Sequence, residues 1–269
     1  MSEYATCKFT SAYVTKKNNT GIGNQLFQIS NVLSFCKKNN LTPVFPQIKT
    51  SHNSIKYKDN IFRKLNTDSN KFRQVYREKS YFYNKIDIKL KYNILFEGYY
   101  QSEKYFLDHK DLILETFGPT EEIKKYIIDK YGEKLKNSTS IHVRQGDYLE
   151  MKNCYHNLLE SDYYKNALEK ITEENILVFS DNIEKVKNNK IFTDSRITFI
   201  ENESSIIDFY LMSMCQNNVI GNSTFSWWAA YLNTNKHKII YYPEKWFDSE
   251  LSHLNTIDLI PENWINIKC

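Results

Sequence analysis

The chain has 269 residues, and its formal net charge of +4 is small because 36 Lys and Arg are interspersed with 32 Asp and Glu. This length suits one large domain or two of about 130 residues each, and the mixed charges argue against a dedicated nucleic-acid binder while allowing a basic site for a nucleoside diphosphate. Five cysteines without a Cys-x-x-Cys pair, and no run near the ~20 apolar residues that span a bilayer, predict a cytoplasmic protein that is soluble or peripherally membrane-associated.

The first half of the chain has weak periodicity. Apolar residues recur at helical spacing after a loop rich in Asn and Gly, and Thr120 can cap a helix whose first turn holds Glu121 and Glu122. The predicted strands are 8–14, 42–45 and 92–96, and the predicted helices are 24–37, 102–106, 110–117 and 120–131.

The second half alternates regularly between strand and helix patterns. The predicted strands are 140–144, 176–180, 197–201, 218–221 and 239–242, and the predicted helices between them are 162–172, 182–189, 205–216 and 223–232. This alternation predicts a parallel, doubly wound α/β sheet. We place the domain boundary in the loop at 132–138, which gives an N-terminal domain of 1–136 and a C-terminal domain of 137–269.

The segment from Ile141 to Tyr148 is the most informative in the chain. Its alternation predicts a strand that stops at Gly146, so His142 and Arg144 point to the same side near the carboxyl end. Ligands bind at that end of an open α/β sheet, and the planar fork of Arg matches phosphate oxygens. Arg144 is therefore either a diphosphate ligand or a surface residue paired with Asp147.

Two other segments place polar groups beside predicted strands. The run Gly21-Ile22-Gly23-Asn24-Gln25 predicts either a loop whose backbone approaches a ligand or an ordinary Gly turn with Asn24 as N-cap. Asp181 ends an apolar strand, where its carboxylate can accept hydrogen bonds from guanine. The alternative is that Asp181 or Asn182 caps the next helix.

Small hydroxyl residues follow a later strand, at Asn222-Ser223-Thr224. Backbone N–H groups, the helix dipole and the two hydroxyls would form an anion site there, unless the segment is only a capped core helix. For Trp228 we predict packing. The sequence contains no Asp-x-Asp, no P-loop and no His pair at metal-ligand spacing, so we expect neither a metal nor another cofactor.

Five segments together resemble the α-1,2-fucosyltransferase family, glycosyltransferase family 11. They are 21–28, 98–106, 142–148, 179–182 and the pair 208–216 with 222–233, and they occur in the family's order over nearly the whole chain. The resemblance implies a GT-B fold with two Rossmann-like domains facing a central cleft. It also implies metal-independent, inverting transfer of L-fucose from GDP-β-L-fucose to the 2-hydroxyl of galactose in an acceptor glycan.

The resemblance implies roles for individual residues. Arg144 would bind the diphosphate, His142 would support that Arg or contact the donor, and Asp181 would read guanine. The other implied donor-binding residues are Gly23, Asn24, Gln25, Asn222, Ser223, Thr224 and Phe225. Asp147 is the nearest candidate for a catalytic base, and it could equally pair with Arg144 or hold the turn.

Two residues depart from the family pattern. Gln145 stands where the signature has a second Arg, and Asn182 stands where it has a second Asp. The missing second Arg removes one nearby cation, which puts in question either how tightly the donor binds or which donor is used. The rival hypotheses are a transferase of the same superfamily with a different acceptor or linkage, and a non-catalytic nucleotide or sugar binder.

Overall fold

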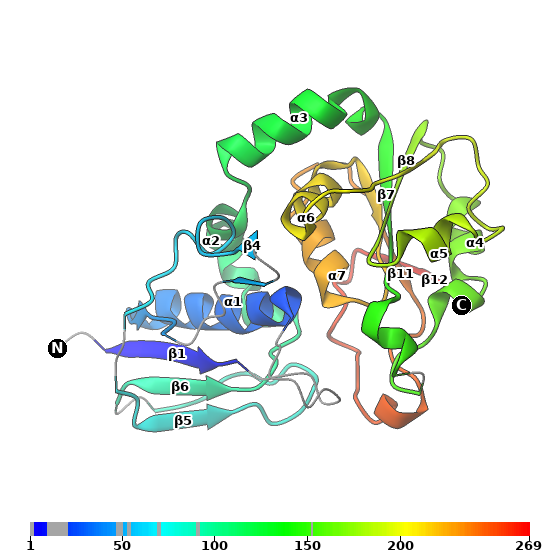
Figure 1. The fold of residues 1–269 in the computed structure, drawn as a ribbon. Helices are drawn as coiled ribbons and strands as arrows, with labels where there is room; N and C mark the ends of the chain where they lie inside the picture. Colours follow the sequence, from blue (N-terminus) through cyan, green and yellow to red (C-terminus); the bar gives the residue numbers. More distant parts are fainter. Residues whose placement is uncertain are drawn as a thin grey trace. The chain divides into compact units, whose positions relative to one another are not determined.

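The computed structural model describes residues 3–9, 21–46, 51–52, 55–68, 71–89, 92–151 and 153–269. The chain forms two compact units (Figure 1), one of Met1–Gly118 with Asn255–Glu262 and one of Pro119–Leu254 with Asn263–Cys269. The two units divide at Gly118/Pro119, just before helix α3 (Glu121–Leu135), whereas the boundary predicted from the sequence lay after this helix, at 136/137. The structure groups α3 with the second unit because this helix packs against helix α6 and strand β8 of that unit.

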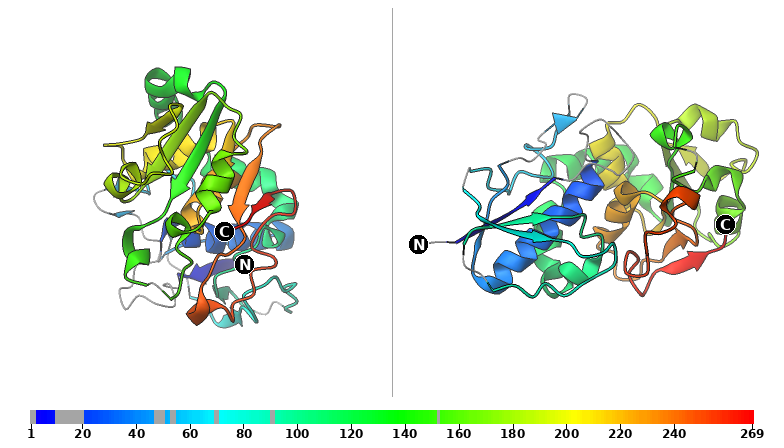
Figure 2. Two further views of the ribbon diagram at one scale, coloured as in Figure 1. Left: turned by 90° about the vertical axis from the view of Figure 1, so that its right-hand side faces the viewer. Right: turned by 90° about the horizontal axis from the view of Figure 1, so that it is seen from below.

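The first unit contains a four-stranded parallel sheet in the order β2-β1-β6-β5. Helix α1 packs on strands β1 and β2, and a short antiparallel pair, β3 with β4, lies apart from this sheet. Figure 2 shows further views. The strands are β1 (Tyr4–Lys8), β2 (Thr42–Pro43), β3 (Ser51–His52), β4 (Ile55–Lys56), β5 (Gln74–Arg77) and β6 (Ile94–Glu97), and the helices are α1 (Ile22–Asn39), η1 (Glu103–Tyr105), η2 (Leu107–His109) and α2 (Lys110–Phe117).

Helix α1 confirms the helix expected over 24–37 and extends it at both ends. It begins after Gly21 and ends at Asn39; the capping residue Asn40 has a left-handed backbone (φ 56°) and donates its N–H to the Cys36 carbonyl. Strand β1 ends at Lys8, so the strand expected over 8–14 is wrong in its start, and residues 10–14 lie outside the described residues.

The second unit contains a six-stranded parallel sheet in the order β12-β11-β10-β7-β8-β9. Read from the other edge, this is the strand order 3-2-1-4-5-6 of a Rossmann fold. The strands are β7 (Ser138–Val143), β8 (Asn175–Ser180), β9 (Ile197–Phe199), β10 (Asn217–Val219), β11 (Ile240–Pro243) and β12 (Ile265–Ile267). The helices are α3, η3 (Gly146–Leu149), η4 (Leu158–Glu160), α4 (Tyr163–Leu168), α5 (Ile183–Lys187), α6 (Ser205–Met214), α7 (Thr224–Tyr231) and η5 (Ser249–Leu251).

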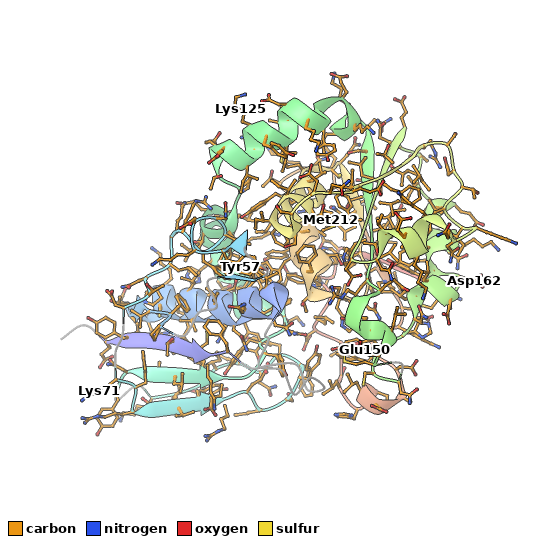
Figure 3. The ribbon with its side chains drawn as sticks, viewed as in Figure 1. Tyr57, Lys71, Lys125, Glu150, Asp162 and Met212 are labelled. Atoms are coloured by element: carbon orange, nitrogen blue, oxygen red, sulfur yellow. The ribbon has the colours of Figure 1, made fainter. Side chains whose placement is uncertain are left out.

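Helices cover both faces of this sheet. Helices α6 and α7 lie on one face, and α4 and α5 lie on the other (Figure 1). Met212, labelled on α6 in Figure 3, is 1% exposed, which shows how fully the inner side of that helix is buried. Two-sided covering explains why β8 is an apolar run in the sequence and why all six residues of β7 are buried.

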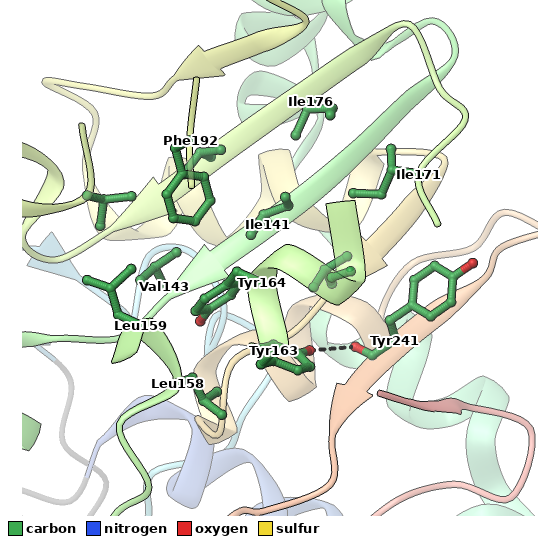
Figure 4. Packing of buried hydrophobic residues seen from close by; sticks show 14 of the residues in the cluster. Ile141, Val143, Leu158, Leu159, Tyr163, Tyr164, Ile171, Ile176, Phe192 and Tyr241 are labelled. Carbon is green, nitrogen blue, oxygen red and sulfur yellow. Dashed lines mark hydrogen bonds between the residues drawn. The ribbon is translucent and has the colours of Figure 1, made fainter. Parts of the chain in front are cut away.

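The core under α4 positions the ends of the two central strands (Figure 4). Ile141 and Val143 of β7 pack there with the rings of Tyr163 and Tyr164. The Tyr164 hydroxyl donates to the His142 carbonyl at 2.8 Å, and the Tyr163 hydroxyl donates to the Ile220 carbonyl at 2.6 Å. Burial raises the pKa of both hydroxyls, so they remain neutral donors that hold the chain where β7 and β10 end.

Most elements expected in this half are confirmed with shifts at their ends. Thr120 caps α3, because its side chain accepts a hydrogen bond from the Ile123 N–H. Strand β12 was not expected from the sequence. Within the part of the chain that the structure describes, no helix is both long enough and apolar enough to cross a bilayer.

Candidate functional site

The candidate site lies where the strand order of the second unit reverses. Strand β7 pairs with β8 on one side and with β10 on the other, and all three are parallel, so their carboxyl ends meet at one edge. From this point the chain runs to β8 and β9 on one side and to β11 and β12 on the other. Doubly wound sheets bind ligands at such a reversal of strand order. Arg144 follows β7, Asp181 follows β8, and Asn222 with Ser223 follows β10.

Arg144 and Asp181 form an ion pair across this edge. The Arg144 Nη1 atom lies 2.6 Å from Asp181 Oδ2, and the side chains are 30% and 26% exposed. The other carboxylate oxygen, Oδ1, accepts a hydrogen bond from the Gln145 N–H at 2.8 Å. Both oxygens of Asp181 thus already have partners within the unit. Asp181 does not cap α5, because Asn182 performs that role.

Gly146 allows this carboxylate to approach the backbone. A Cβ atom at position 146 would lie 2.2 Å from Asp181 Oδ2 and 3.8 Å from Arg144 Cζ. Any larger side chain would therefore push Asp181 away from its place beside Arg144. The glycine of the signature segment has a steric reason to be there.

His142 is a neutral group beneath the edge. It is 4% exposed, and burial lowers the pKa of its imidazole to about 4. The Asp181 charge opposes this shift, and the Arg144 charge adds to it. The ring packs 5.7 Å from that of Phe225, and Nδ1 has no hydrogen-bond partner among the residues that the structure describes. At neutral pH the His142 imidazole can donate or accept a hydrogen bond, but it adds no positive charge to the site.

Helix α7 begins at the same edge. Ser223 is its N-cap, and the Ser223 side chain accepts a hydrogen bond from the Phe225 N–H at 3.3 Å. Thr224 is the first helical residue, so the amides of the first turn and the positive end of the dipole lie beside the ends of β7 and β10. Trp227 and Trp228 are fully buried, which confirms packing for Trp228.

The side chain of Asn222 has a structural role. Its Nδ2 atom donates to the His156 carbonyl at 2.9 Å and to the Trp246 carbonyl at 3.0 Å. Asn222 thereby ties the turn after β10 to two other loops. Asn222 was expected to bind the donor, but it is 2% exposed and its amide NH2 already donates to these two carbonyls.

Asp208, a carboxylate that we did not predict as a site residue, lies in the first turn of α6. Burial and the nearby charge of Glu203 raise its pKa to about 7, and its Oδ1 atom is buried with no hydrogen-bond partner in the described part of the chain. The adjacent Phe209 ring lies 5.3 Å from that of Phe225. Because α6 follows β9, its first turn lies toward the same edge as Arg144. An acid in a first helical turn usually offsets the helix dipole, so the sequence did not distinguish it.

Three expected donor-binding residues belong to the first unit. Gly23, Asn24 and Gln25 lie in the first turn of α1, whose N-cap is Gly21 rather than Asn24. The Asn24 Oδ1 atom accepts a hydrogen bond from Gln101 Nε2 at 2.9 Å. Gly23 and Gln25 are buried.

A partly buried carboxylate supports the segment after β6. Glu78 accepts hydrogen bonds from the N–H groups of Tyr99 (2.7 Å) and Tyr100 (3.0 Å), and Gln28 Nε2 donates to the Gly98 carbonyl at 2.8 Å. Burial raises the pKa of Glu78 to about 7. This network explains why the segment 98–101 has a distinctive sequence: Gly98 has a φ of +154°, and a Cβ there would meet Glu78 Cβ at 2.4 Å.

The side chain of Asp147, the expected base, lies outside the described residues, although its backbone is part of η3. Over the side chains that the structure describes, no three His, Cys, Asp or Glu residues gather closely enough to hold a metal ion.

Comparison with known proteins identifies the family. The model of glycosyl transferase family 11 matches residues 6–268, which is nearly the whole chain. The chain belongs to glycosyltransferase family 11. The family expected from the five segments is thus confirmed.

Three curated proteins are similar in sequence to this family 11 chain. It is 34% identical to the Escherichia coli O-antigen biosynthesis glycosyltransferase WbnK, over 69% of this chain and 65% of WbnK, slightly less than two thirds of that relative's length. It is 34% identical to an Escherichia coli alpha-1,2-colitosyltransferase, over 78% of this chain and 73% of the relative. It is 26% identical to the putative galactoside 2-alpha-L-fucosyltransferase svh-11 of Caenorhabditis elegans, over 98% and 82%.

Solved structures establish the fold of this family 11 member. POFUT1 in complex with GDP matches with a TM-score of 0.55 at 13% identity, covering 90% of this chain and 98% of POFUT1. The NodZ alpha-1,6-fucosyltransferase matches with a TM-score of 0.53 at 12% identity, covering 86% and 93%. Arabidopsis thaliana FUT1 matches with a TM-score of 0.53 at 16% identity, covering 97% and 76%. The predicted GT-B fold class is confirmed.

Proposed function

We propose that this chain transfers L-fucose from GDP-β-L-fucose to the 2-hydroxyl of a galactose in an acceptor glycan, with inversion and without a metal. One observation carries the proposal: in a family 11 chain, Arg144 stands at the switch point of a Rossmann sheet beside the first turn of α7. The putative fucosyltransferase function of the nematode relative supports the same donor and linkage.

Arg144 and the start of α7 would hold the donor's diphosphate. Breaking the glycosyl–phosphate bond leaves negative charge on GDP, while the sugar passes through an oxocarbenium-like transition state. Fixed cations and helix-end amides stabilise such charge without reorganisation. Because His142 is neutral, Arg144 is the cation that we assign to this task, and Ser223 and Thr224 supply hydroxyls and amides.

We assign the guanine contact to Asp208 rather than to Asp181. Both oxygens of Asp181 already accept contacts from Arg144 and the Gln145 N–H, which suits a residue that orients the guanidinium. Asp208 has a buried oxygen without a hydrogen-bond partner among the described residues, and the ring of the next residue, Phe209, lies 5.3 Å from that of Phe225. A buried carboxylate of this kind can accept hydrogen bonds from the N–H groups on the guanine edge.

The roles expected of other residues stay predictions. They are donor contact by Gly23, Asn24, Gln25 and His142, and proton removal from the acceptor by Asp147. Packing of Phe225 against the nucleoside is a further prediction; its ring contacts those of His142 and Phe209.

A second candidate function is transfer of colitose, which is L-fucose without its 3-hydroxyl. It is favoured by the alpha-1,2-colitosyltransferase relative, which is more similar to this chain than the nematode protein is. Both candidates share the GDP moiety and the site described above, and they differ only in how the sugar ring is recognised.

A donor and acceptor screen by mass spectrometry tests the proposal. The purified chain is incubated with GDP-fucose, GDP-colitose, GDP-mannose and UDP-galactose, each with galactose-terminated and glucose-terminated oligosaccharides. We expect a deoxyhexose added to galactose-terminated acceptors from GDP-fucose. Product from GDP-colitose alone would replace fucose by colitose, and product from UDP-galactose alone would contradict the assignment of the site to GDP.

A further inference from the structure

The ring of Tyr148 lies next to the guanidinium of Arg144. The Arg144 Cζ atom is 5.4 Å from the ring centroid, which is within the range of a cation–π contact. Tyr148 belongs to η3, the turn that directly follows β7. Asp181 contacts the guanidinium through Nη1, so the carboxylate and the ring constrain the same group from two different residues.

Tyr148 is itself held by a stack of rings. It lies parallel to Tyr155, with centroids 3.9 Å apart and planes 10° apart. Tyr155 contacts Phe247 at 5.7 Å, and their backbones form an isolated antiparallel bridge. The stack therefore connects Arg144 to the loop that follows β11, on the same edge of the sheet.

The hydroxyl of Tyr148 reaches the other half of the site. It donates a hydrogen bond to the Asn222 carbonyl at 3.0 Å. Asn222 directly precedes Ser223 and Thr224, and its side chain is fixed to the His156 and Trp246 carbonyls. One side chain thus contacts both the cation after β7 and the turn after β10.

We propose that Tyr148 is a positioning residue, which sets the Arg144 guanidinium and the 222–224 turn at the spacing required by the donor's diphosphate. This inference rests on the proposed function, because it assumes that these two groups bind one diphosphate. A ring beneath the guanidinium limits its rotation while leaving its edge N–H groups available to oxygen acceptors. The hydroxyl transmits any displacement of the ring to the turn.

The two parts of the side chain can be tested separately. Tyr148→Phe keeps the ring and removes the bond to Asn222, and Tyr148→Leu removes both. Tyr126→Leu is a matched control on α3, because Tyr126 also has a cation over its ring (Lys130, 5.6 Å) and a hydroxyl bonded to a partner (Glu203, 3.0 Å). Each Tyr148 variant is also combined with Arg144→Ala as a double variant. Thermal unfolding checks that every variant is folded.

Calorimetry with GDP, titrated to millimolar concentrations, provides the main measurement. We expect Tyr148→Leu to weaken GDP binding about tenfold and Tyr148→Phe about threefold, with the acceptor KM unchanged. In the Arg144→Ala background, Tyr148→Leu should weaken binding by no more than about threefold, because the group it positions is gone. Inhibition by guanosine, which lacks phosphate, should be unchanged in all Tyr148 variants.

Two results would overturn the inference. One is a folded Tyr148→Leu variant that binds GDP as well as the wild type or as well as Tyr126→Leu. The other is the full tenfold loss in the Arg144→Ala background, which would show that Tyr148 acts independently of Arg144. Wild-type protein that prefers UDP or ADP would refute the proposed donor instead, and the same cycle measured with that nucleotide would still test Tyr148.

Discussion

Replacing Asp181 by Asn should separate stability from donor use. Arg144 Nη1 and Asp181 Oδ2 are 2.6 Å apart, and their side chains are 30% and 26% exposed. A partly exposed ion pair contributes about 1 kcal/mol or less, and a hydrogen bond to a charged group about 1.5–3 kcal/mol. After discounting for solvent screening, we expect Asp181→Asn to lower the free energy of unfolding by about 1–2 kcal/mol. The Asn amide has one acceptor oxygen in place of two, so its NH2 group would face either the Arg144 guanidinium or the Gln145 N–H, both of which are donors, and Arg144 would be held less firmly.

The chain offers a close control for this variant. Asp194 Oδ2 lies 2.7 Å from Arg196 Nη2, with the side chains 28% and 31% exposed, and its Oδ1 accepts the Arg196 N–H at 2.9 Å. This pair precedes β9, at the amino end of the strands, whereas Asp181 follows β8 at their carboxyl end.

Urea unfolding and steady-state kinetics with GDP-fucose then give the comparison. Both Asn variants should lose similar stability, while only Asp181→Asn should lower kcat/KM for the donor, by about tenfold, equivalent to about 1.4 kcal/mol. Wild-type donor kinetics in Asp181→Asn, or an equal loss of kcat/KM in Asp194→Asn, would show that Asp181 does not orient Arg144 for the donor.

Three further predictions follow from the site. Arg144→Lys keeps the charge but loses the planar fork, so GDP-fucose turnover should fall at least about 100-fold; near-normal turnover at saturating donor would remove Arg144 from the mechanism. Because burial raises the pKa of Asp208 to about 7, its ionised form increases as the pH rises through that value, so GDP affinity should increase between about pH 6 and 8. Asp208→Asn should abolish this pH dependence and narrow the preference for GDP over ADP and UDP, and an unchanged ratio of the three affinities would place the guanine contact elsewhere. Transfer should continue in excess EDTA; loss of activity that Mg²⁺ or Mn²⁺ restores would reveal a metal requirement.

The direction of the Asp208 pKa shift also predicts how the free energy of unfolding changes with pH. The pKa of Asp208 in the folded protein lies above its ordinary value of 3.8, so the folded state binds the proton more tightly than the unfolded state does. Its contribution to stability is therefore present at low pH and is lost as the pH rises to about 7. The Asn variant should be more stable than the wild type above that pH.

The second unit was largely predictable because its local patterns agree with its tertiary structure. The apolar run of β8 is buried on both faces of a parallel sheet, and Thr120 caps α3 as its sequence indicates. The extent of each unit was not predictable, because it depends on contacts distant in sequence. Residues 255–262 belong to the first unit, where Asp258 pairs with Lys104 at 2.5 Å across 154 positions.

The site was predictable only in part, for a similar reason. Alternation along β7 placed Arg144 at a strand end, but nothing local indicated that Asp181, on the neighbouring strand, would pair with it. The raised pKa of Asp208 depends on burial, and the contact of Tyr148 with Arg144 depends on how a turn folds back. Neither property can be derived from residue type and spacing alone.

The chemical structure of the product tests the proposed transfer of L-fucose to galactose directly. The chain is incubated with GDP-β-L-fucose and a β-galactoside, and the purified product is examined by two-dimensional NMR. We expect an α-linked L-fucose, inverted from the donor, joined to the 2-position of galactose, and no such product from the Arg144→Ala variant. A β-linked fucose, a linkage to another position, or release of GDP without any transfer to galactose would contradict it.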